Sequence, residues 1–219
     1  MSKYLISDIH GDNEAFINAI DWMDLKKDDE LILNGDLIDR GIDSKGVLDT
    51  TMDLIENGYN VTCLKGNHEQ MFLESLNDFS TKINWIRNGG REFLLSFNTT
   101  DLSEIPSKYI DFVSSFDLYA LRSNYIIVHA GINMLSESPF DDIKSMLWLR
   151  DWQKVYDKKW LGNRRVIHGH TPMTKTNIID QFDTNKDVIC IDNGSFLKGI
   201  DYGSLCVLNL DDFKVHFQK

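Results

Sequence analysis

The sequence predicts an α/β fold with two mixed sheets flanked by helices and built on β-α-β-α-β units. Three observations predict it. Short apolar runs rich in strand-forming residues recur in the first third of the chain, segments with helical spacing separate them, and further strand-like runs fill the second half. The first runs recur at roughly the 30-residue interval of a βαβ unit, so the core of the sheet should be parallel with right-handed crossovers.

The N-terminal elements alternate between strand and helix. Strand-like runs occupy residues 4–7, 31–34 and 60–65, and each is too short for a helix. Between them, apolar residues recur at the spacing of a helix face. The first predicted helix has Phe16, Ile17, Ile20 and Met23 on this face, and the second has Val47, Leu48, Met52, Leu54 and Ile55.

The rest of the chain divides into a helical part and a second group of strands. Residues 68–123 are predicted to be mostly helical, with breaks at residues 88–90 and at Pro106, and to form an insertion beside the site. Strand-like runs follow at residues 125–128, 165–167, 188–191, 204–208 and 214–217. Because few helices separate the last three runs, we expect them to form the second, mixed sheet. A length of 219 residues suits one α/β domain, so a single domain over residues 1–219 is predicted.

Composition and charge limit the class of protein. Hydrophobic residues make up 42% and charged residues 26%, as in ordinary folded proteins. A carboxylate at Asp8 comes too early for a signal peptide, and no stretch reaches 18 apolar residues, so a cytoplasmic location without a membrane partner is expected. The three cysteines, Cys63, Cys190 and Cys206, lie in apolar runs without paired spacing and are predicted to be buried thiols.

The net charge of −11 argues against nucleic acid as a partner, because such binding depends on Lys and Arg that neutralise phosphates. The same charge would repel a phosphorylated substrate. A phosphate-handling site in this chain must therefore supply its own arginines and bound cations.

Polar clusters with metal-binding side chains follow five of the predicted strands directly. They are Asp8-x-His10-Gly11, Gly35-Asp36-x-x-Asp39-Arg40-Gly41, Gly66-Asn67-His68-Glu69, His129-Ala130-Gly131 and His168-Gly169-His170. Ligands of open α/β sheets bind outside the carboxyl ends of the strands, so these clusters should meet in one site. Five of the six histidines lie in them, which random scatter would not produce. His168 is also compatible with a core or supporting role, and His216 with a purely structural one.

The types of ligand predict the kind of metal centre. Two aspartates, three histidines and an asparagine carbonyl, without a thiolate, suit divalent first-row metals. Six side chains are too many for one tetrahedral zinc, but they suit two ions about 4 Å apart that share a carboxylate, as in phosphatases. Asp36 is the expected shared ligand, because its strand lies between neighbours that end in Asp8 with His10 and in Asn67.

These motifs resemble those of the calcineurin-like metallophosphoesterases, and specifically the phosphoprotein phosphatase family with its small bacterial and bacteriophage lambda members. The first three clusters match the linked signatures of that family in order and spacing, and His129-Ala130-Gly131 and Gly169-His170-Thr171-Pro172 are similar to its later histidine motifs. Trp85-x-x-Asn88-Gly89-Gly90 is similar to a segment of the phage and bacterial members. The resemblance implies a metallophosphoesterase-type β-sandwich.

The resemblance also implies roles for individual residues. One metal would be held by Asp8, His10 and Asp36, and the other by Asp36, Asn67, His129 and His170. The expected ions are Mn²⁺, with Fe²⁺, Zn²⁺, Co²⁺ or Ni²⁺ as alternatives, and a hydroxide between them would attack phosphorus directly. His68 would protonate the leaving group, with Asp39 orienting its ring. Arg40 and Asn67 would bind the substrate phosphate.

A second phosphate-binding arginine is usual in the family, and Arg150, in Trp148-Leu149-Arg150, resembles it by order and context. Three other arginines compete for this role: Arg122, Arg164 and Arg165.

The function implied is removal of phosphate from phosphoserine or phosphothreonine proteins and peptides, with phosphotyrosine as an alternative. A symmetrical dinucleoside tetraphosphate hydrolase remains a second hypothesis, since those enzymes share most of the motifs. A nuclease is disfavoured because Pro172 stands where those enzymes commonly have another metal-binding histidine. A catalytically inactive phosphoprotein-binding module is disfavoured because the expected ligands and the proton donor are all present.

Overall fold

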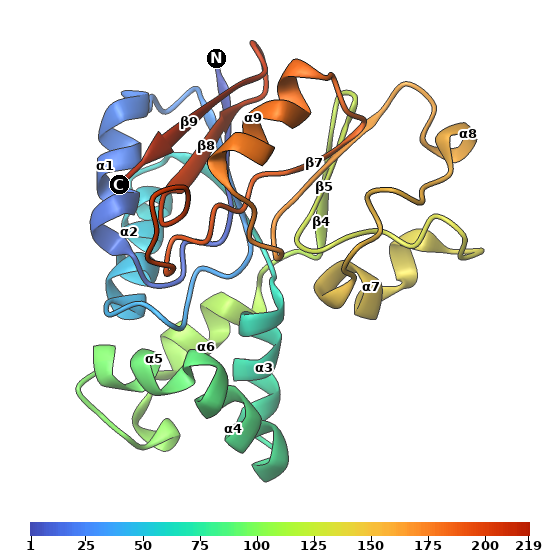
Figure 1. The fold of residues 1–219 in the computed structure, drawn as a ribbon. Coiled ribbons are helices and arrows are strands. Elements are labelled where there is room, and N and C mark those ends of the chain that lie inside the picture. The colour runs from blue at the N-terminus through green and yellow to red at the C-terminus, as the bar shows by residue number, and fades with distance from the viewer.

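The computed structural model describes residues 1–219 and contains two mixed β-sheets with helices around them (Figure 1). The predicted fold class is therefore confirmed. The strands of the five-stranded sheet, in spatial order, are β3 (Asn60–Leu64), β2 (Glu30–Asn34), β1 (Lys3–Ile6), β8 (Leu205–Asn209) and β9 (Lys214–Gln218). Those of the four-stranded sheet are β4 (Tyr119–Arg122), β5 (Tyr125–Val128), β6 (Arg165–His168) and β7 (Val188–Cys190).

The parallel core lies where the repeated β-α-β pattern predicts it. Strand β2 pairs in parallel with β1 on one side and with β3 on the other. The helices that connect them are α1 (Asn13–Met23) and α2 (Ser44–Glu56). Each begins at an aspartate, because the side chains of Asp12 and Asp43 accept hydrogen bonds from first-turn amides that would otherwise lack a partner.

The assignment of the last strands to sheets was wrong in part. Strand β7 joins β6 in the four-stranded sheet, whereas β8 pairs antiparallel with β1 and β9 pairs with β8. The C-terminal hairpin therefore extends the first sheet instead of completing the second. Strand β4 was also not predicted, since residues 68–123 were expected to be mostly helical. It pairs antiparallel with β5 across a short turn, and this partner stabilises the strand.

Alternate residues of each strand pack into different cores, as the two-residue period of a strand requires. Leu5 and Ile32 of one sheet and Ile127 and Ile167 of the other are buried together between the sheets. The outer face of the first sheet packs on α1, α2 and the helical insertion. The outer face of the second sheet packs on the segment that contains α7 (Ile143–Trp148) and α8 (Lys158–Leu161), and helix α9 (Lys175–Asp183) precedes β7. All three cysteines are buried and free, as predicted.

The insertion forms the lower lobe in Figure 1. It contains α3 (Asn67–Ser75), α4 (Phe79–Trp85), a π-helical turn η1 (Ile86–Gly90), α5 (Arg91–Ser96), the short η2 (Leu102–Glu104) and α6 (Ser107–Ser114). Another short helical turn, η3 (Pro139–Asp141), precedes α7. None of the helices combines the length and the apolar character that crossing a bilayer requires.

Candidate metal centre

The predicted ligands meet at the carboxyl ends of strands from both sheets. Asp8 and His10 follow β1, Asp36 follows β2 and Asn67 begins the helix after β3, while His129 and His170 follow β5 and β6 in the second sheet. All six side chains are buried. The site therefore lies where the two sheets adjoin, which explains why ligands so distant in sequence converge.

One group of possible metal ligands contains Asp36, His129 and His170, whose ligand atoms lie within 4.8 Å of one another. The side-chain oxygen of Asn67 belongs to the same cluster, because it lies 2.8 Å from Nδ1 of His170 and 3.1 Å from Nε2 of His129. Oδ1 of Asp36 lies 3.4 Å from Nε2 of His129. The four ligands expected for the second metal are thus brought together.

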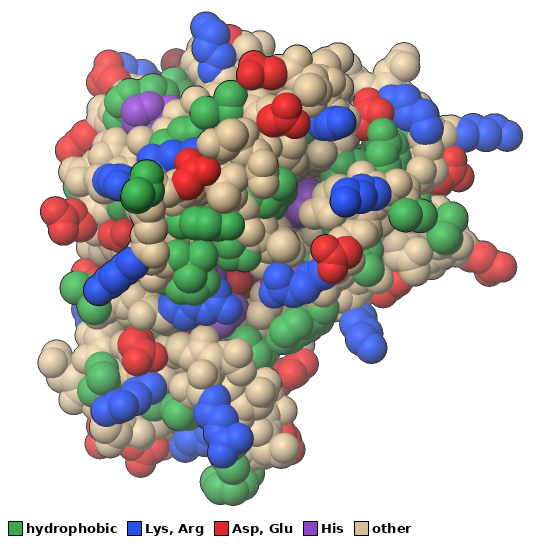
Figure 2. Space-filling model, in the orientation of Figure 1, with side chains coloured by type: hydrophobic (Ala, Val, Ile, Leu, Met, Phe, Trp, Pro, Cys, Tyr) green, Lys and Arg blue, Asp and Glu red, His purple; other side chains and the backbone are tan.

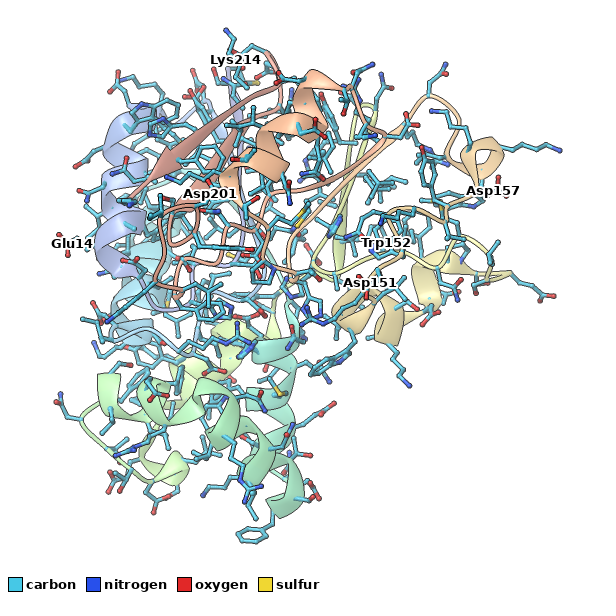
Figure 3. All side chains as sticks on the ribbon, in the orientation of Figure 1. Glu14, Asp151, Trp152, Asp157, Asp201 and Lys214 are labelled. Atoms are coloured by element: carbon cyan, nitrogen blue, oxygen red, sulfur yellow. The ribbon has the colours of Figure 1, made fainter.

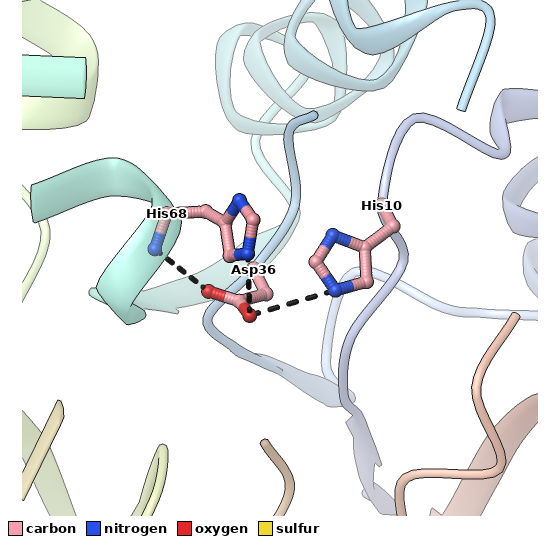
Figure 4. A group of neighbouring side chains, drawn as sticks. All are labelled: His10, Asp36 and His68. Atoms are coloured by element: carbon pink, nitrogen blue, oxygen red, sulfur yellow. Dashed lines mark hydrogen bonds and ion pairs between the residues drawn. The ribbon is translucent and has the colours of Figure 1, made fainter. Parts of the chain in front are cut away.

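A second group contains His10, Asp36 and His68, again within 4.8 Å (Figure 4). Oδ2 of Asp36 lies 3.5 Å from Nε2 of His10 and 3.9 Å from Nε2 of His68, and Oδ1 accepts a hydrogen bond from the backbone amide of His68 at 3.0 Å. Asp36 belongs to both groups, which is the arrangement that a shared ligand requires.

Asp8 lies beside these groups without being a member of either. Its carboxylate accepts hydrogen bonds from the backbone amide of His170, at 3.0 and 3.1 Å, and from the hydroxyl of Ser7. It links the ends of β1 and β6 across the site. Of the ligands expected for the first metal, the structure groups His10 and Asp36 together with His68, and a ligand role for Asp8 stays a prediction.

The chemistry of the site fits divalent metal ions. Nε2 of His68 and Nε2 of His170 are buried and have no hydrogen-bond partner, which is costly unless another group, such as an ion, satisfies them. The donors around Asp36 are imidazole nitrogens and carboxylate or amide oxygens without a thiolate, a set that suits first-row divalent ions.

The electrostatics of the site lead to the same conclusion. Burial by itself lowers the pKa of His129, but the carboxylates of Asp36 and Asp8 outweigh it and raise the pKa to about 10. Burial likewise favours neutral Asp36, but His129 and His68 outweigh it and hold the pKa of Asp36 well below its usual value. The buried carboxylates thus require positive charge. Metal ligands must bind in their deprotonated forms, so a divalent ion would supply this charge in place of the histidine protons.

His68 and Asp39 form a buried pair at the edge of the second group. Nδ1 of His68 lies 2.7 Å from Oδ2 of Asp39. Burial lowers the pKa of His68, but Asp36 and Asp39 outweigh it and raise the pKa above its usual value. Asp39 is itself held in place by Ser44, whose hydroxyl accepts a hydrogen bond from the Asp39 backbone. A carboxylate that fixes one ring nitrogen leaves the other free to transfer a proton.

Two arginines border the ligand groups. Nη1 of Arg40 lies 2.9 Å from Nε2 of His10, and its guanidinium carbon lies 4.2 Å from the ring centre of Phe196. Nη1 of Arg150 donates to the backbone oxygen of His170 and to the hydroxyl of Thr171, both at 3.1 Å. Figure 2 shows Lys or Arg side chains next to histidine atoms on the face drawn there.

The competing arginines have other partners. Arg122 pairs with Glu30, Arg164 donates to the backbone oxygens of Trp160 and Leu161, and Arg165 lies over the ring of Phe213. Of the four candidates, Arg150 is therefore the one that the structure brings to the ligand groups.

Backbone strain is concentrated in the same place. Six of the predicted site residues adopt positive φ angles, which residues other than glycine seldom do: Asp8, His10, Asp36, Asp39, Arg40 and His170. Such conformations cost on the order of 1–3 kcal/mol each and persist where the surrounding structure enforces them, commonly at functional sites.

Two residues at the site were given no role by the sequence. The side chain of Glu69 accepts four backbone N–H bonds, from Gly66, Asp36, Leu37 and Ile38, at 2.8 to 3.3 Å. It thereby joins the loops after β2 and β3. The sequence signal that could have indicated this role is the motif Gly66-Asn67-His68-Glu69, which contains Glu69. No sequence pattern indicated Phe196, because it belongs to an irregular loop. Its ring lies edge-on to that of His10, with ring centres 4.9 Å apart.

The loop that contains Phe196 is fixed by hydrogen bonds. The hydroxyl of Ser195 donates to the backbone oxygens of Asp8 and Ile9, and the side-chain amide of Asn193 donates to the backbone oxygens of Met173 and Asp201. Asp201 is labelled in Figure 3 within this loop. These bonds hold Phe196 over the end of β1.

Replacing Glu69 with glutamine is expected to lower the free energy of unfolding of the metal-free protein by about 1–3 kcal/mol, because an amide group would face buried N–H donors. The midpoint of urea unfolding measures this effect. Glu137→Gln, at an exposed position, is the matched control and should leave the midpoint unchanged. Equal midpoints for the two variants would contradict the role of Glu69.

The remaining histidines lie outside both groups. His168 is buried against Trp152, with Nδ1 3.0 Å from the oxygen of Gly169 and Nε2 3.3 Å from the amide of Gln153. His216 stacks on Trp22 with ring centres 3.8 Å apart. Neither histidine is directed at the ligand groups.

The family model for calcineurin-like phosphoesterases matches residues 1–199. The chain is 24% identical over 180 residues to serine/threonine-protein phosphatase 1 of Salmonella typhimurium, which covers 78% of this chain and 79% of that protein. It is 30% identical over 133 residues to a symmetrical bis(5'-nucleosyl)-tetraphosphatase of Nitrosomonas europaea, but that match covers only 60% of this chain and 45% of the relative.

Solved structures show the same fold at low identity. A putative diadenosine tetraphosphatase has a TM-score of 0.68 at 17% identity, with 99% of this chain and 92% of that chain covered. A protein serine/threonine phosphatase from Saccharomyces cerevisiae also has a TM-score of 0.68, at 14% identity, with 100% of this chain and 80% of that chain covered. With the family model matching 199 of 219 residues, the chain belongs to the calcineurin-like phosphoesterases.

Proposed function

We propose that this protein is a metal-dependent phosphomonoesterase that removes phosphate from phosphoserine or phosphothreonine in proteins and peptides, with phosphotyrosine as a further substrate. The observation that favours this function is the buried pair of His68 and Asp39 beside the ligand groups. A serine or threonine alkoxide is a strongly basic leaving group and needs a proton donor. Symmetrical cleavage of a dinucleoside tetraphosphate releases a nucleoside diphosphate, which is weakly basic and needs such a donor far less.

The residues of this chain have distinct roles in the proposal. Asp8, His10 and Asp36 would hold one ion, and Asp36, Asn67, His129 and His170 the other, with Mn²⁺ as the expected metal. Such ions lower the pKa of water and neutralise charge on the phosphoryl oxygens. His68 gives the proton on Nε2 to the leaving oxygen, and Asp39 keeps the ring in place through Nδ1. Arg40 and Arg150 bind phosphate oxygens from two sides, and the Asn67 amide supplies a further donor.

A symmetrical dinucleoside tetraphosphatase is the second candidate, supported by the relative in Nitrosomonas europaea and by a structural neighbour. The match to the Salmonella typhimurium phosphatase extends over more of both chains. A polyphosphate also brings more negative charge than a monoester, so the net charge of −11 repels it more strongly at long range.

A turnover panel tests the proposal. The protein is stripped with a chelator and reloaded with Mn²⁺, and kcat/KM is measured for phosphoserine, phosphothreonine and phosphotyrosine peptides and for diadenosine tetraphosphate. Activity that depends on added metal and is highest on phosphopeptides supports the proposal. A large advantage for the dinucleotide would assign the second function, and binding of phosphopeptides without any turnover would indicate an inactive binding module.

A further inference from the structure

The segment from Trp85 to Gly90 has no part in the function proposed above, although its sequence is distinctive. Trp85 is the last residue of α4 and is completely buried, and the π-helical turn η1 follows it. Within η1, Gly89 has a φ of 118°, so this turn is a kink between two helices and not a regular helical turn. The segment belongs to the insertion, yet it contacts the loop after β2 that carries Asp39 and Arg40.

Trp85 is directed at the proton-donor pair. Its indole Nε1 donates to Oδ2 of Asp39 at 2.9 Å, and the same oxygen lies 2.7 Å from Nδ1 of His68. The other oxygen of Asp39 is buried without a partner. If the carboxylate rotated, its Oδ2 would lose both donors. The indole N–H and the imidazole N–H therefore fix one orientation of Asp39 between them.

The two glycines allow the turn to lie against this loop. The backbone oxygen of Gly89 accepts a hydrogen bond from the Arg40 amide at 3.2 Å. Gly89 has a φ of 118°, and a Cβ atom there would lie 2.6 Å from the Arg40 nitrogen. A Cβ atom at Gly90 would lie 2.4 Å from the Trp85 ring. Side chains at these positions would separate the turn from Arg40 and Trp85.

Packing alone would explain only part of this arrangement. Trp85 contacts the rings of Phe72 and Phe93, with centres 5.5 and 5.6 Å away, and these contacts stabilise the insertion. Phenylalanine at position 85 would preserve them. A purely structural tryptophan would therefore be replaceable by phenylalanine without a selective effect on the reaction.

We infer that Trp85 and Gly89 are positioning residues of the reaction, Trp85 by holding Asp39 against His68 and Gly89 by holding the backbone of Arg40. The inference rests on the proposed function, since it takes His68 as the proton donor and Arg40 as a phosphate ligand. In this role the insertion positions two consecutive residues: Asp39, which orients the proton donor, and Arg40, which binds phosphate.

The first test is Trp85→Phe, which keeps the aromatic packing and removes the N–H donor. On a phosphoserine peptide we expect kcat to fall about tenfold with little change in KM, as loss of a hydrogen bond to a charged group implies. On 2,4-dinitrophenyl phosphate, whose leaving group departs without a proton, kcat should stay near wild type. In an Asp39→Asn background the same substitution should have no further effect.

Trp152→Phe is the matched control. Trp152, labelled in Figure 3, is also buried, and its Nε1 donates to the backbone oxygen of Ala130 at 3.0 Å. Any loss in this variant should be equal for both substrates. An equal loss for Trp85→Phe, or no loss, would overturn the role of Trp85.

A measurement on metal-free protein separates this inference from the proposed function. In ¹H–¹⁵N spectra of indole groups, Asp39→Asn should shift the Trp85 resonance and leave that of Trp152 unchanged. Trp85→Phe should speed exchange of the His68 Nδ1 proton with water. These readouts need no turnover, so they judge the positioning contact even if the substrate panel contradicts phosphomonoesterase activity. Unchanged resonance and exchange would overturn the inference.

The second test compares Gly89→Ala with Gly162→Ala. Both glycines have positive φ, so both variants incur backbone strain, but a Cβ atom at Gly162 would meet nothing within 4 Å. Gly89→Ala should raise KM for both phosphate substrates about tenfold or more, because small displacements of binding groups are costly. Gly162→Ala should leave KM unchanged. Equal KM values for the two variants would contradict the role of Gly89.

Discussion

Replacing Asp36 with asparagine is expected to lower kcat/KM on a phosphoserine peptide by roughly three orders of magnitude or more, since stabilisation of several kcal/mol depends on the ions. Asp36 is the one carboxylate that belongs to both ligand groups. An amide has no negative charge and keeps only one ligand oxygen, so both metal positions are weakened together. Bound metal per chain, measured by mass spectrometry, should fall in parallel with activity.

Asp29→Asn is the matched control for Asp36. Asp29 is also a buried carboxylate beside β2, but it lies at the opposite end of the strand and accepts hydrogen bonds from the backbone amides of Ser2 and Lys26. This variant should keep its metal and its activity. An Asp36→Asn protein with full metal content and wild-type turnover would contradict a shared ligand at this position.

Replacing His68 with alanine is expected to lower kcat on phosphoserine peptides by about 10²–10⁴-fold, the usual contribution of a general acid. The effect should depend on the leaving group. On 2,4-dinitrophenyl phosphate the loss should be small, because the departing phenolate is stable without a proton. A series of aryl phosphates with leaving groups of increasing pKa measures this dependence directly.

Metal content decides between two roles for His68. Its Nε2 lies 3.9 Å from Asp36 and its ring belongs to one ligand group, so the geometry is also compatible with metal binding. If His68 is the proton donor, His68→Ala retains its metal and loses activity selectively on poor leaving groups. Loss of metal with an equal decline on all substrates would make it a ligand. His216→Ala, at a histidine that stacks on Trp22 away from the site, should match wild type.

The proposed general acid and the two arginines would act against unfavourable long-range electrostatics. The net charge of −11 would repel the proposed phosphorylated substrates at long range, so their binding would depend on cations concentrated within the site. The buried carboxylates there attract metal ions, and Arg40 and Arg150 border the same groups. This arrangement would allow a phosphate-binding site in an acidic protein.

The sequence by itself determined the class of fold and the location of the site. Short strands, each followed at once by a polar cluster, predicted the parallel β1–β3 core and the convergence of Asp36, His129 and His170. These features are local, since strand length and helical periodicity appear within a few residues. The rule that parallel strands end at the same edge then connects clusters that lie far apart in the chain.

Only the tertiary structure decided which strands pair and where each side chain points. The backbone groups that pair two strands are the same in every sequence, so they do not specify which strands pair. The pairing of β8 with β1 depends instead on packing between the sheets. The late strands were assigned to the wrong sheet for this reason. The direction of Asp8 toward the amide of His170 likewise depends on β6, which lies in the other sheet. The contact of Trp85 with Asp39 joins the insertion to the loop after β2, and no local pattern encodes a hydrogen bond between residues 46 positions apart.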